Sequence, residues 1–321
     1  MNRRDFLGTS AMAAAGAAAA AAIGLSAAPV VAQDGSIGLA TARHFKVGDA
    51  TVTALSDGFL PIGAELMNGV SEADFQALLR AAYIDSATHP TGVNAYLIET
   101  DGRRVLVDAG TGAAMGPALG HLARNMTALG IDPQSIDTVV ATHLHPDHIG
   151  GIAAVASNPF GAARLVVDRN DIDFWNNADI KAQAPEGVQP FFDLAQATLA
   201  RFGERVEAVS GEVSLGAGLT TIPLPGHTAG HMGVMLESGG DALLIWGDIV
   251  HVPPVQFARP DVTIGFDFDA DMARATRQSI LDRAATDRLR VAGMHIGFPG
   301  TGYVERAAQG YHFVSAPYPY G

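Results

Sequence analysis

Six consecutive residues, His143-Leu144-His145-Pro146-Asp147-His148, constrain this chain more than any other part of it. They place three imidazoles and a carboxylate directly after the apolar run from Asp137 to Thr142. Imidazole nitrogens and carboxylate oxygens suit zinc and its neighbours, and the sequence has 0 cysteines, so no thiolate competes with them. The segment therefore predicts a metal site just beyond a strand, with metal-assisted hydrolysis as its chemistry.

The alternation of an extended segment would send His143 and His145 to one side, whereas Asp147 and His148 would turn toward another. One segment could then supply two adjacent metals. Two sites need more ligands than four residues provide, so the others must come from elsewhere in the chain. Three candidates stand just beyond later apolar runs: His227, Asp248 and His295.

The first 32 residues have the pattern of an export signal. Paired arginines precede Phe-Leu and an alanine-rich run that ends at Ala32. This pattern predicts a twin-arginine signal peptide, 1–32, followed by one mature domain, 33–321. The run is also about long enough to span a bilayer, but alanine is weakly hydrophobic and small residues lie at the expected cleavage site. We therefore expect a periplasmic or secreted protein whose mature chain has no stable membrane insertion.

The composition limits the partners of the mature protein. The sequence has 20 Lys and Arg against 33 Asp and Glu, a formal net charge of −13, and is 48% hydrophobic. Such a chain can bury a large core, and its acidic surface repels nucleic acid and other polyanions. We expect no nucleic-acid partner and a small neutral or apolar substrate. The absence of cysteine agrees with export to an oxidising compartment.

Short apolar runs rich in β-branched residues alternate with helical patterns along the rest of the chain. Strands are predicted at 94–100, 104–108, 138–142, 164–168, 219–224, 232–236, 242–246 and 289–294. Helices are predicted at 71–82, 113–129, 190–201 and 270–285, the first with Ser71 as N-cap and Asp74 at the capping-box offset. No flexible linker divides these elements. They predict one α/β domain whose sheets carry helices on their outer faces.

The order of the candidate ligands resembles that of the metallo-β-lactamase fold hydrolases, whose His-x-His-x-Asp-His motif is followed by a later His, Asp and His. The resemblance extends over essentially the whole mature chain and implies an αββα sandwich. It also implies two divalent metal ions, zinc first, with manganese, cobalt or iron able to occupy the same ligands. By this resemblance, His143, His145 and His227 hold one metal; Asp147, His148 and His295 hold the other; and Asp248 bridges the two.

Two such ions can share a hydroxide as nucleophile, so Asp147 and Asp248 would be catalytic through the metals that they hold. Asp108, at the end of a predicted strand, is expected to accept an imidazole N–H and orient that ligand. His231 is expected to orient its loop rather than bind metal. Three other histidines fit ordinary core or surface positions: His44, His121 and His312.

Four segments, 51–58, 94–110, 142–151 and 246–256, resemble the methyl parathion hydrolases, an exported organophosphate-degrading branch of this family. This resemblance implies cleavage of phosphotriesters, with lactones and esters as further substrates. His251 occupies the position at which acyl-homoserine lactone lactonases carry a tyrosine, three residues after the bridging Asp. It is expected either to donate a hydrogen bond or proton to the substrate or simply to line the pocket. The candidate apolar walls are Phe59, Trp175, Phe191 and Phe192, although aromatic residues in such a chain more often belong to the core. The resemblance favours a place in the pocket for Trp175 and for one of Phe191 and Phe192.

Two alternative functions fit the same residues. The first is a lactonase of the quorum-quenching kind with only promiscuous phosphotriesterase activity. The second, from another class, is an exported protein that binds metal or ligand without turnover, because a fold does not by itself imply a reaction. The family's dimers make a homodimer the expected oligomer.

Overall fold

Two seven-stranded sheets form the centre of the protein in a computed structural model that describes residues 41–317. The expected signal peptide, 1–32, lies outside the described residues. The first sheet has the order β1 (Ala42–Val47), β2 (Ala50–Gly63), β4 (Thr88–Thr100), β5 (Arg103–Val107), β6 (Thr138–Val140), β7 (Arg164–Asp168) and β8 (Val206–Val209). The second has the order β16 (Tyr311–Ser315), β15 (Thr301–Arg306), β14 (Arg290–Ala292), β12 (Asp241–Ile245), β11 (Met232–Ser238), β10 (Leu219–Pro223) and β9 (Ser214–Gly216).

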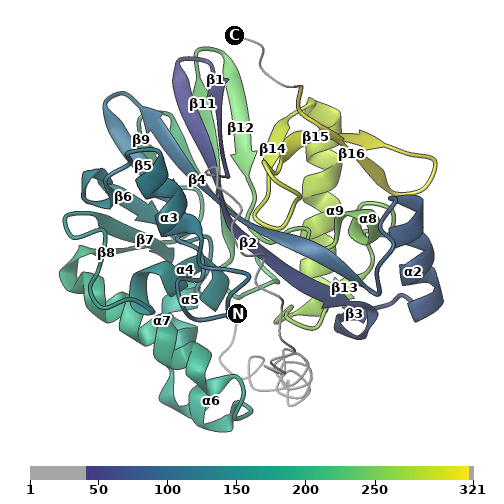
Figure 1. Cartoon of the computed structure of the whole chain (residues 1–321), viewed down its shortest axis with the longest axis horizontal. Coiled ribbons are helices and arrows are strands. Elements are labelled where there is room, and N and C mark those ends of the chain that lie inside the picture. The colour runs from purple at the N-terminus through teal and green to yellow at the C-terminus, as the bar shows by residue number, and fades with distance from the viewer. Residues whose placement is uncertain (1–40, 318–321) are drawn as a thin grey trace.

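Helices cover the outer face of each sheet, and α7 and α9 lie on opposite sides of the molecule (Figure 1). The first sheet is covered by α3 (Leu122–Ala128), α4 (Pro146–Ala153), α5 (Arg169–Trp175), α6 (Ala178–Gln183) and α7 (Gln189–Phe202). The second is covered by α9 (Ala270–Asp287). This arrangement confirms the predicted αββα sandwich.

A smaller lobe extends from the far end of β2. It contains α2 (Glu72–Ala81), α8 (Pro253–Gln256) and a two-stranded sheet of β3 (Met67–Asn68) and β13 (Thr263–Ile264), which share one apolar cluster. Three short 3₁₀ helices complete the described elements: Ala64–Leu66, Pro133–Ser135 and Gly203–Arg205. In the range 41–317, no helix has both the length and the apolar character needed to cross a bilayer.

The pleat of the central strands explains why their sequences are apolar at nearly every position. On β4, Ile98 faces the core between the two sheets, whereas Leu97 faces the helices of the first sheet. On β12, Ile245 faces the same central core and Leu244 faces α9. Because successive side chains point to opposite faces, a strand buried on both sides must be apolar throughout.

The central strands of both sheets end at the same edge of the sandwich. In the first sheet, β5, β6 and β7 run parallel, and in the second, β12 and β14 run parallel. The loops that follow the carboxyl ends of β6, β10, β12 and β14 carry the candidate ligands, whose donor atoms meet. Ligand sites at the carboxyl ends of parallel strands are a general property of α/β sheets.

Each strand predicted from the apolar runs is present, as are the helices predicted at 71–82, 190–201 and 270–285. Ser71 caps α2 as expected, since its Oγ accepts the backbone N–H of Asp74 at 3.1 Å. The strands and helices that the sequence did not predict are β1, β2, β3, β8, β9, β13, β15 and β16 and the short helices α4, α5, α6 and α8.

The helix predicted at 113–129 is wrong over its first half, because α3 begins only at Leu122. Gly116 and Gly120 adopt φ values of +92° and +80°, in the region that favours glycine and that a helix does not use. The loop instead wraps around the buried carboxylate of Asp57, which accepts the N–H groups of Thr111, Gly120 and Leu122 at 2.9, 3.1 and 2.8 Å. A tertiary anchor therefore replaces the local helical pattern.

Candidate metal centre

The hexad changes conformation in its middle. His145 is the N-cap of α4, so Asp147 and His148 lie in the first helical turn rather than in an extended segment as predicted. Pro146 explains the change, because its fixed φ and missing N–H suit the first position of a helix. The expectation of two directions from one segment holds, but its cause is a strand-to-helix transition.

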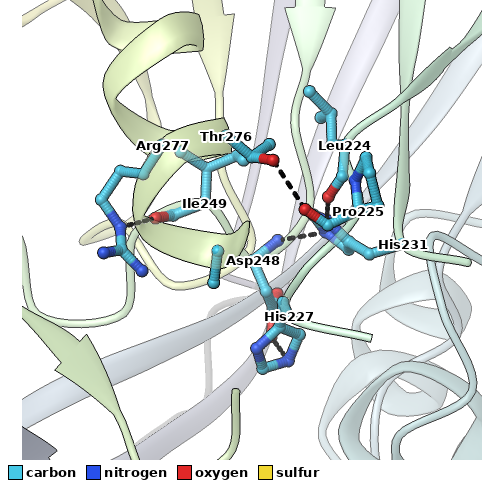
Figure 2. A pocket seen from close by; sticks show the side chains of 9 residues that line it. Leu224, Pro225, His227, His231, Asp248, Ile249, Thr276 and Arg277 are labelled. Atoms are coloured by element: carbon cyan, nitrogen blue, oxygen red, sulfur yellow. Dashed lines mark hydrogen bonds and ion pairs between the residues drawn. The ribbon is translucent and has the colours of Figure 1, made fainter. Parts of the chain in front are cut away.

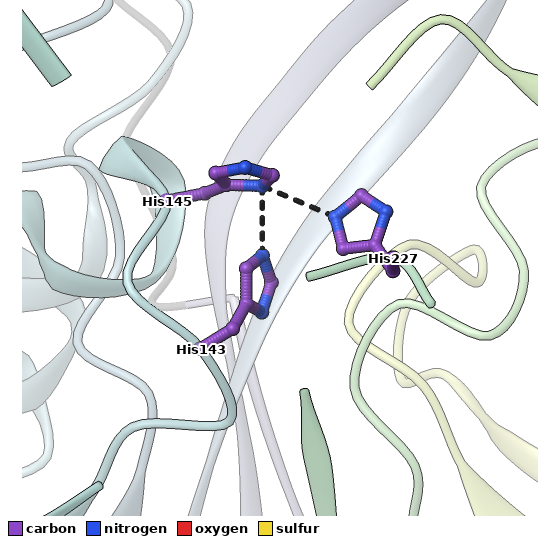
Figure 3. A group of neighbouring side chains, drawn as sticks. All are labelled: His143, His145 and His227. Atoms are coloured by element: carbon purple, nitrogen blue, oxygen red, sulfur yellow. Dashed lines mark hydrogen bonds between the residues drawn. The ribbon is translucent and has the colours of Figure 1, made fainter. Parts of the chain in front are cut away.

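The first group of donor atoms consists of three histidines, His143, His145 and His227. The Nδ1 of His145 lies 2.9 Å from the Nε2 of His143 and 3.1 Å from the Nε2 of His227 (Figure 3). The first two come from the loop after β6 and the third from the loop after β10. Three ring nitrogens that converge so closely form a set of donors suited to a zinc-like ion.

The second group consists of Asp147, His148 and His295. The Oδ2 of Asp147 lies 3.4 Å from the Nε2 of His148 and 3.4 Å from the Nε2 of His295. Here the carboxylate and one imidazole come from α4, and the other imidazole follows β14. The group mixes nitrogen and oxygen donors, whereas the first group has only nitrogen.

Asp248, which follows β12, lies between the two groups. Its Oδ2 is 3.7 Å from the Nε2 of His143 and 3.3 Å from that of His227, and 3.3 and 3.0 Å from the Nε2 atoms of His148 and His295. One oxygen thus contacts both donor groups, which is the position expected of a bridging ligand.

Unpartnered polar atoms at the same place fit bound cations. The Nε2 of His148 and the Oδ1 of Asp248 are buried and have no hydrogen-bond partner among the described residues. Buried polar atoms normally find a partner, because leaving one unpaired costs about 1–3 kcal/mol. The donor types, their convergence and these two atoms fit divalent metals.

Outer partners hold three of the imidazoles in place through their Nδ1 atoms. His148 pairs with the Asp108 carboxylate at 2.7 Å, as expected for Asp108, and His227 pairs with Asp267 at 2.9 Å. The Nδ1 of His295 donates to the backbone carbonyl of Gly92 at 2.8 Å. Engaging Nδ1 in this way leaves Nε2 free and aims it inward.

The crowding of charge shifts the pKa values strongly. Burial opposes protonation of His227, but hydrogen bonds with Asp248 and Asp267 outweigh it and raise its pKa to about 9. Burial, with His148 close by, holds the pKa of His143 well below its usual range. Burial would favour the neutral form of Asp248, yet the surrounding imidazoles hold its pKa well below the ordinary value. An ionised carboxylate and a neutral imidazole are the forms that bind metal, so the shifts of Asp248 and His143 favour metal binding, whereas His227 must lose a proton to become a ligand.

His231 takes no part in either donor group, in line with the orienting role predicted for it. Its Nδ1 donates to the carbonyl of Leu224 at 2.7 Å, and its Nε2 accepts the backbone N–H of Asp248 at 2.9 Å. Figure 2 shows these bonds among the side chains that line a small cavity. The cavity has a volume of about 10 Å³, and His231, Asp248 and Arg277 are part of its lining. That volume suits at most about one water. His231 therefore supports the backbone that carries Asp248.

The structure places His251, predicted to meet the substrate, against the donor groups. Its Nε2 lies 3.2 Å from the Oδ2 of Asp248, and its ring stacks on His295 with the centroids 4.9 Å apart. Both ring nitrogens are buried and have no hydrogen-bond partner in the range 41–317. Its backbone N–H donates to Gln256 Oε1 at 2.7 Å, which fixes the loop. The catalytic and substrate-binding roles of His251 stay predictions.

The aromatic residues predicted as pocket walls occupy different environments. Trp175 is buried, and its ring meets that of His145 edge-on at 5.7 Å. Phe192 is buried behind Trp175 at 4.7 Å, and Phe191 is half-buried on the same helix. Phe59, on β2, is 48% exposed. Trp175 thus supports a candidate ligand directly, and the substrate-binding role of all four stays a prediction.

Sequence reasoning missed three residues around the site, namely His89, Asp171 and Asp267. His89 Nδ1 lies 2.8 Å from the hydroxyl of Thr91, which itself donates to the carbonyl of His251 at 3.1 Å. Neither aspartate stands at a spacing typical of metal ligands, so no pattern pointed to it. The other three histidines, His44, His121 and His312, belong to none of the donor groups of the described chain.

Known proteins resemble this chain in sequence and in fold. Residues 89–295 match the family model described as the metallo-beta-lactamase superfamily. A probable metallo-hydrolase of Mycobacterium tuberculosis is 28% identical over 182 residues, which cover 47% of this chain and 54% of the relative. A beta-lactamase-like protein 2 homolog of Caenorhabditis elegans is 27% identical over 164 residues, 50% of this chain and 47% of the relative. The chain thus spans about half the length of these curated relatives.

Solved structures match over more of the fold. The hydrolase AbOPH of the beta lactamase superfamily has a TM-score of 0.81 at 27% identity, covering 88% of this chain and 99% of its own. AidC, a dizinc quorum-quenching lactonase, has a TM-score of 0.81 at 24% identity over the same shares and supports the fold alone. Since the family model spans more than half of the chain and includes both donor groups, this chain belongs to the metallo-beta-lactamase superfamily.

Proposed function

We propose that this protein is a metal-dependent hydrolase with two divalent ions, zinc first. One observation carries the proposal: the Oδ2 of Asp248 contacts ring nitrogens of both donor groups, 3.3 Å from His227 in the first and 3.0 Å from His295 in the second. A carboxylate shared in this way is typical of a dinuclear centre rather than of two unrelated sites. Manganese, cobalt and iron suit the same nitrogen and oxygen donors.

Divalent ions bound there lower the pKa of water and polarise the oxygen of a scissile bond, so hydrolysis needs no serine or cysteine nucleophile. The residues of the chain hold the charges and orientations that this requires. Asp147 and Asp248 supply negative charge, because their pKa values lie well below the ordinary range despite burial. Asp108 and Asp267 keep the rings of His148 and His227 in a fixed orientation.

The proposed substrates are small and neutral: aryl phosphotriesters of the kind that methyl parathion hydrolases cleave, together with lactones and esters. The formal net charge of −13 and the aromatic rings near the donor groups support this class. Arg277, a buried cation near Asp248, is not offered to a substrate. Its guanidinium donates to the carbonyls of Ile249 and Val262 at 2.6 and 2.7 Å.

A second candidate is a quorum-quenching type of lactonase with only promiscuous phosphotriesterase activity. One observation favours it: the buried imidazole of His251 lies beside the proposed bridging ligand, with its Nε2 3.2 Å from the Oδ2 of Asp248. An imidazole at that place could donate a hydrogen bond to the ring oxygen of a lactone. The two candidates differ in which substrate has the larger kcat/KM.

We further propose a periplasmic or secreted location through the twin-arginine signal 1–32, and a homodimer in solution. Cell fractionation of the full chain, compared with a variant in which Arg3 and Arg4 are lysine, tests the first. Retention of export by that variant would contradict the twin-arginine route. Sedimentation of the purified mature chain tests the second.

The decisive experiment is a substrate panel on enzyme of defined metal content. The protein is stripped with a chelator, reloaded with Zn²⁺, Mn²⁺, Co²⁺ or Fe²⁺, and assayed with a paraoxon-type triester, an aryl ester and several lactones. His312→Ala, an exposed histidine on β16, is the matched control and should behave like the wild type. A larger kcat/KM for lactones supports the second candidate. Bound metal without hydrolysis of any of these compounds would make the protein a binding protein and overturn the proposal.

A further inference from the structure

One buried carboxylate joins the two loops that carry the first donor group. The Oδ2 of Asp171 accepts the backbone N–H of Leu144 at 3.0 Å, and its Oδ1 accepts that of Gly230 at 2.7 Å. Leu144 stands between His143 and His145, and Gly230 stands three residues after His227. The loops come from different sheets, so each oxygen of one side chain holds a different half of the group.

The position of Asp171 is itself fixed by helix α5. The helix is capped by Asp168, whose Oδ1 accepts the N–H of Asn170 at 2.8 Å. Trp175 lies four residues after Asp171, on the same face of the helix, and meets the ring of His145. Asp171 in the first turn of α5 thus binds the backbone of the ligand loops, and Trp175 in its last turn packs against the side chain of His145.

Glycine at position 230 lets α5 approach closely. A Cβ at this position would lie 2.6 Å from the backbone nitrogen of Asp171 and 2.8 Å from the Oδ1 of Asp168. Neither contact is tolerable, so any larger residue would push the helix and the loop apart. The closeness of α5 to the His227 loop is therefore a second, independent feature of the same junction.

The carboxylate carries a cost that an ordinary packing residue would not. Asp171 is 0% exposed, and burial raises its pKa to about 6. Two backbone N–H groups offset part of the desolvation, since hydrogen bonds to a charged group are the stronger kind. Within residues 41–317 the second donor group has no such shared anchor, because His148 is held by Asp108 and His295 by the carbonyl of Gly92.

We propose that Asp171 is a positioning residue that sets the spacing between the two loops of the first donor group, and so controls metal binding at His143, His145 and His227 but not at Asp147, His148 and His295. The proposal rests on the proposed dinuclear function. It assigns to α5 a role that is separate from the packing of the helix on the first sheet.

The test uses Asp171→Asn, with Asp173→Asn as the matched control, because Asp173 is exposed on the same helix. Asparagine keeps one carbonyl oxygen but turns an NH₂ group toward the other backbone N–H. Chelator competition with Zn²⁺ should show about 10–100-fold weaker binding of one ion, with the other unchanged. The Co²⁺ absorption spectrum of the variant should match that of His227→Ala, which damages the first group, and not that of His295→Ala.

Gly230→Ala tests the same junction without removing the carboxylate, and should cause the same selective loss. It decides the matter if Asp171→Asn does not fold. Three outcomes would overturn the proposal: equally weakened binding of both ions, unchanged binding of both ions, or unfolding of both variants. Each would show that the contact between Asp171 and Gly230 does not control metal binding at the first donor group. Failure of the wild type to bind two ions would instead reject the proposed dinuclear function, so the two failures are distinguishable.

Discussion

The two sheets contribute to the site in different ways. The first sheet supplies four candidate ligands within six residues after one strand, β6, whereas the second supplies one ligand after each of three strands, β10, β12 and β14. In the compact half of the site, formed by the four ligands after β6, the geometry is local, because Pro146 starts a helix shortly after the strand. In the dispersed half, formed by His227, Asp248 and His295, the geometry depends on how three strands pack. The compact half and the dispersed half thus form one centre, and substitutions in them should affect metal binding and activity differently.

The largest expected effect comes from removing the metal ions, which the ligands of the first and second sheets are proposed to hold together. Chelation should abolish hydrolysis and lower the thermal unfolding temperature, because ions at about 1,000 times their Kd stabilise a protein by about 4 kcal/mol each. Differential scanning calorimetry with and without chelator measures this, and added Zn²⁺ should restore both properties. Full activity in chelator would show that the two halves do not meet in a metal centre.

A matched pair of ligand variants compares the halves directly. His145→Ala should remove one ion and lower kcat/KM by about 10³-fold or more, a loss of about 4 kcal/mol of transition-state stabilisation. His295→Ala should remove the other ion with a similar loss. Metal content per chain, measured by elemental analysis, checks both. Loss of the same ion in both variants would contradict the division into two donor groups.

A smaller effect is expected from the carboxylates behind the ligands. Asp267→Asn, in the dispersed half, should weaken metal binding by about 10–100-fold through His227. Asp108→Asn should do more damage, because Asp108 also accepts the N–H and hydroxyl of Thr142 at 2.8 and 2.9 Å and so fixes the start of the hexad. Chelator competition ranks the two variants. A larger loss of metal affinity in Asp267→Asn than in Asp108→Asn would contradict the importance assigned to the contacts of Asp108 with Thr142.

The pH dependence of stability sharpens the comparison on the dispersed side. Burial is the main reason that the pKa of His231 falls to about 3 from 6.5, so its neutral form is the one that the fold holds. Its stabilising contribution is complete above pH 6.5 and is lost as the pH falls toward 3. We expect the free energy of unfolding of metal-free protein to fall more steeply with acid in the wild type than in His231→Gln. Urea unfolding between pH 4 and 7 measures the two slopes, and equal slopes would refute the assignment.

The smallest effect on overall activity is expected at His251, which the dispersed half places beside Asp248. His251→Ala should leave the metal content unchanged and alter the ratio of kcat/KM between a lactone and a triester by about tenfold, about 1.4 kcal/mol. The measurement is the substrate panel on the loaded variant. A uniform loss on all substrates, together with lost metal, would place His251 among the ligands instead.

The same contrast explains what the sequence could predict. The hexad was visible because its donors are adjacent, and the strands were visible because burial on both faces makes them apolar. His227, Asp248 and His295 could be assigned to particular metals only through the family resemblance, since nothing local states which strands end side by side. Asp171 and Asp267 stayed hidden because they act through a backbone N–H or through another side chain. The helix predicted at 113–129 was wrong because Asp57, far away in sequence, organises the loop that replaces its first half.

The dispersed ligands also impose an order on biosynthesis. The hexad leaves the ribosome early, but the first donor group is complete only once residue 227 has been made, and the second only at residue 295 of 321. Contacts of such long sequence separation form late, because the chain between them must be closed into loops first. Loading of the second ion should therefore report that synthesis has passed residue 295: a nascent polypeptide that stops before His295 would contain the whole hexad and still lack the second donor group.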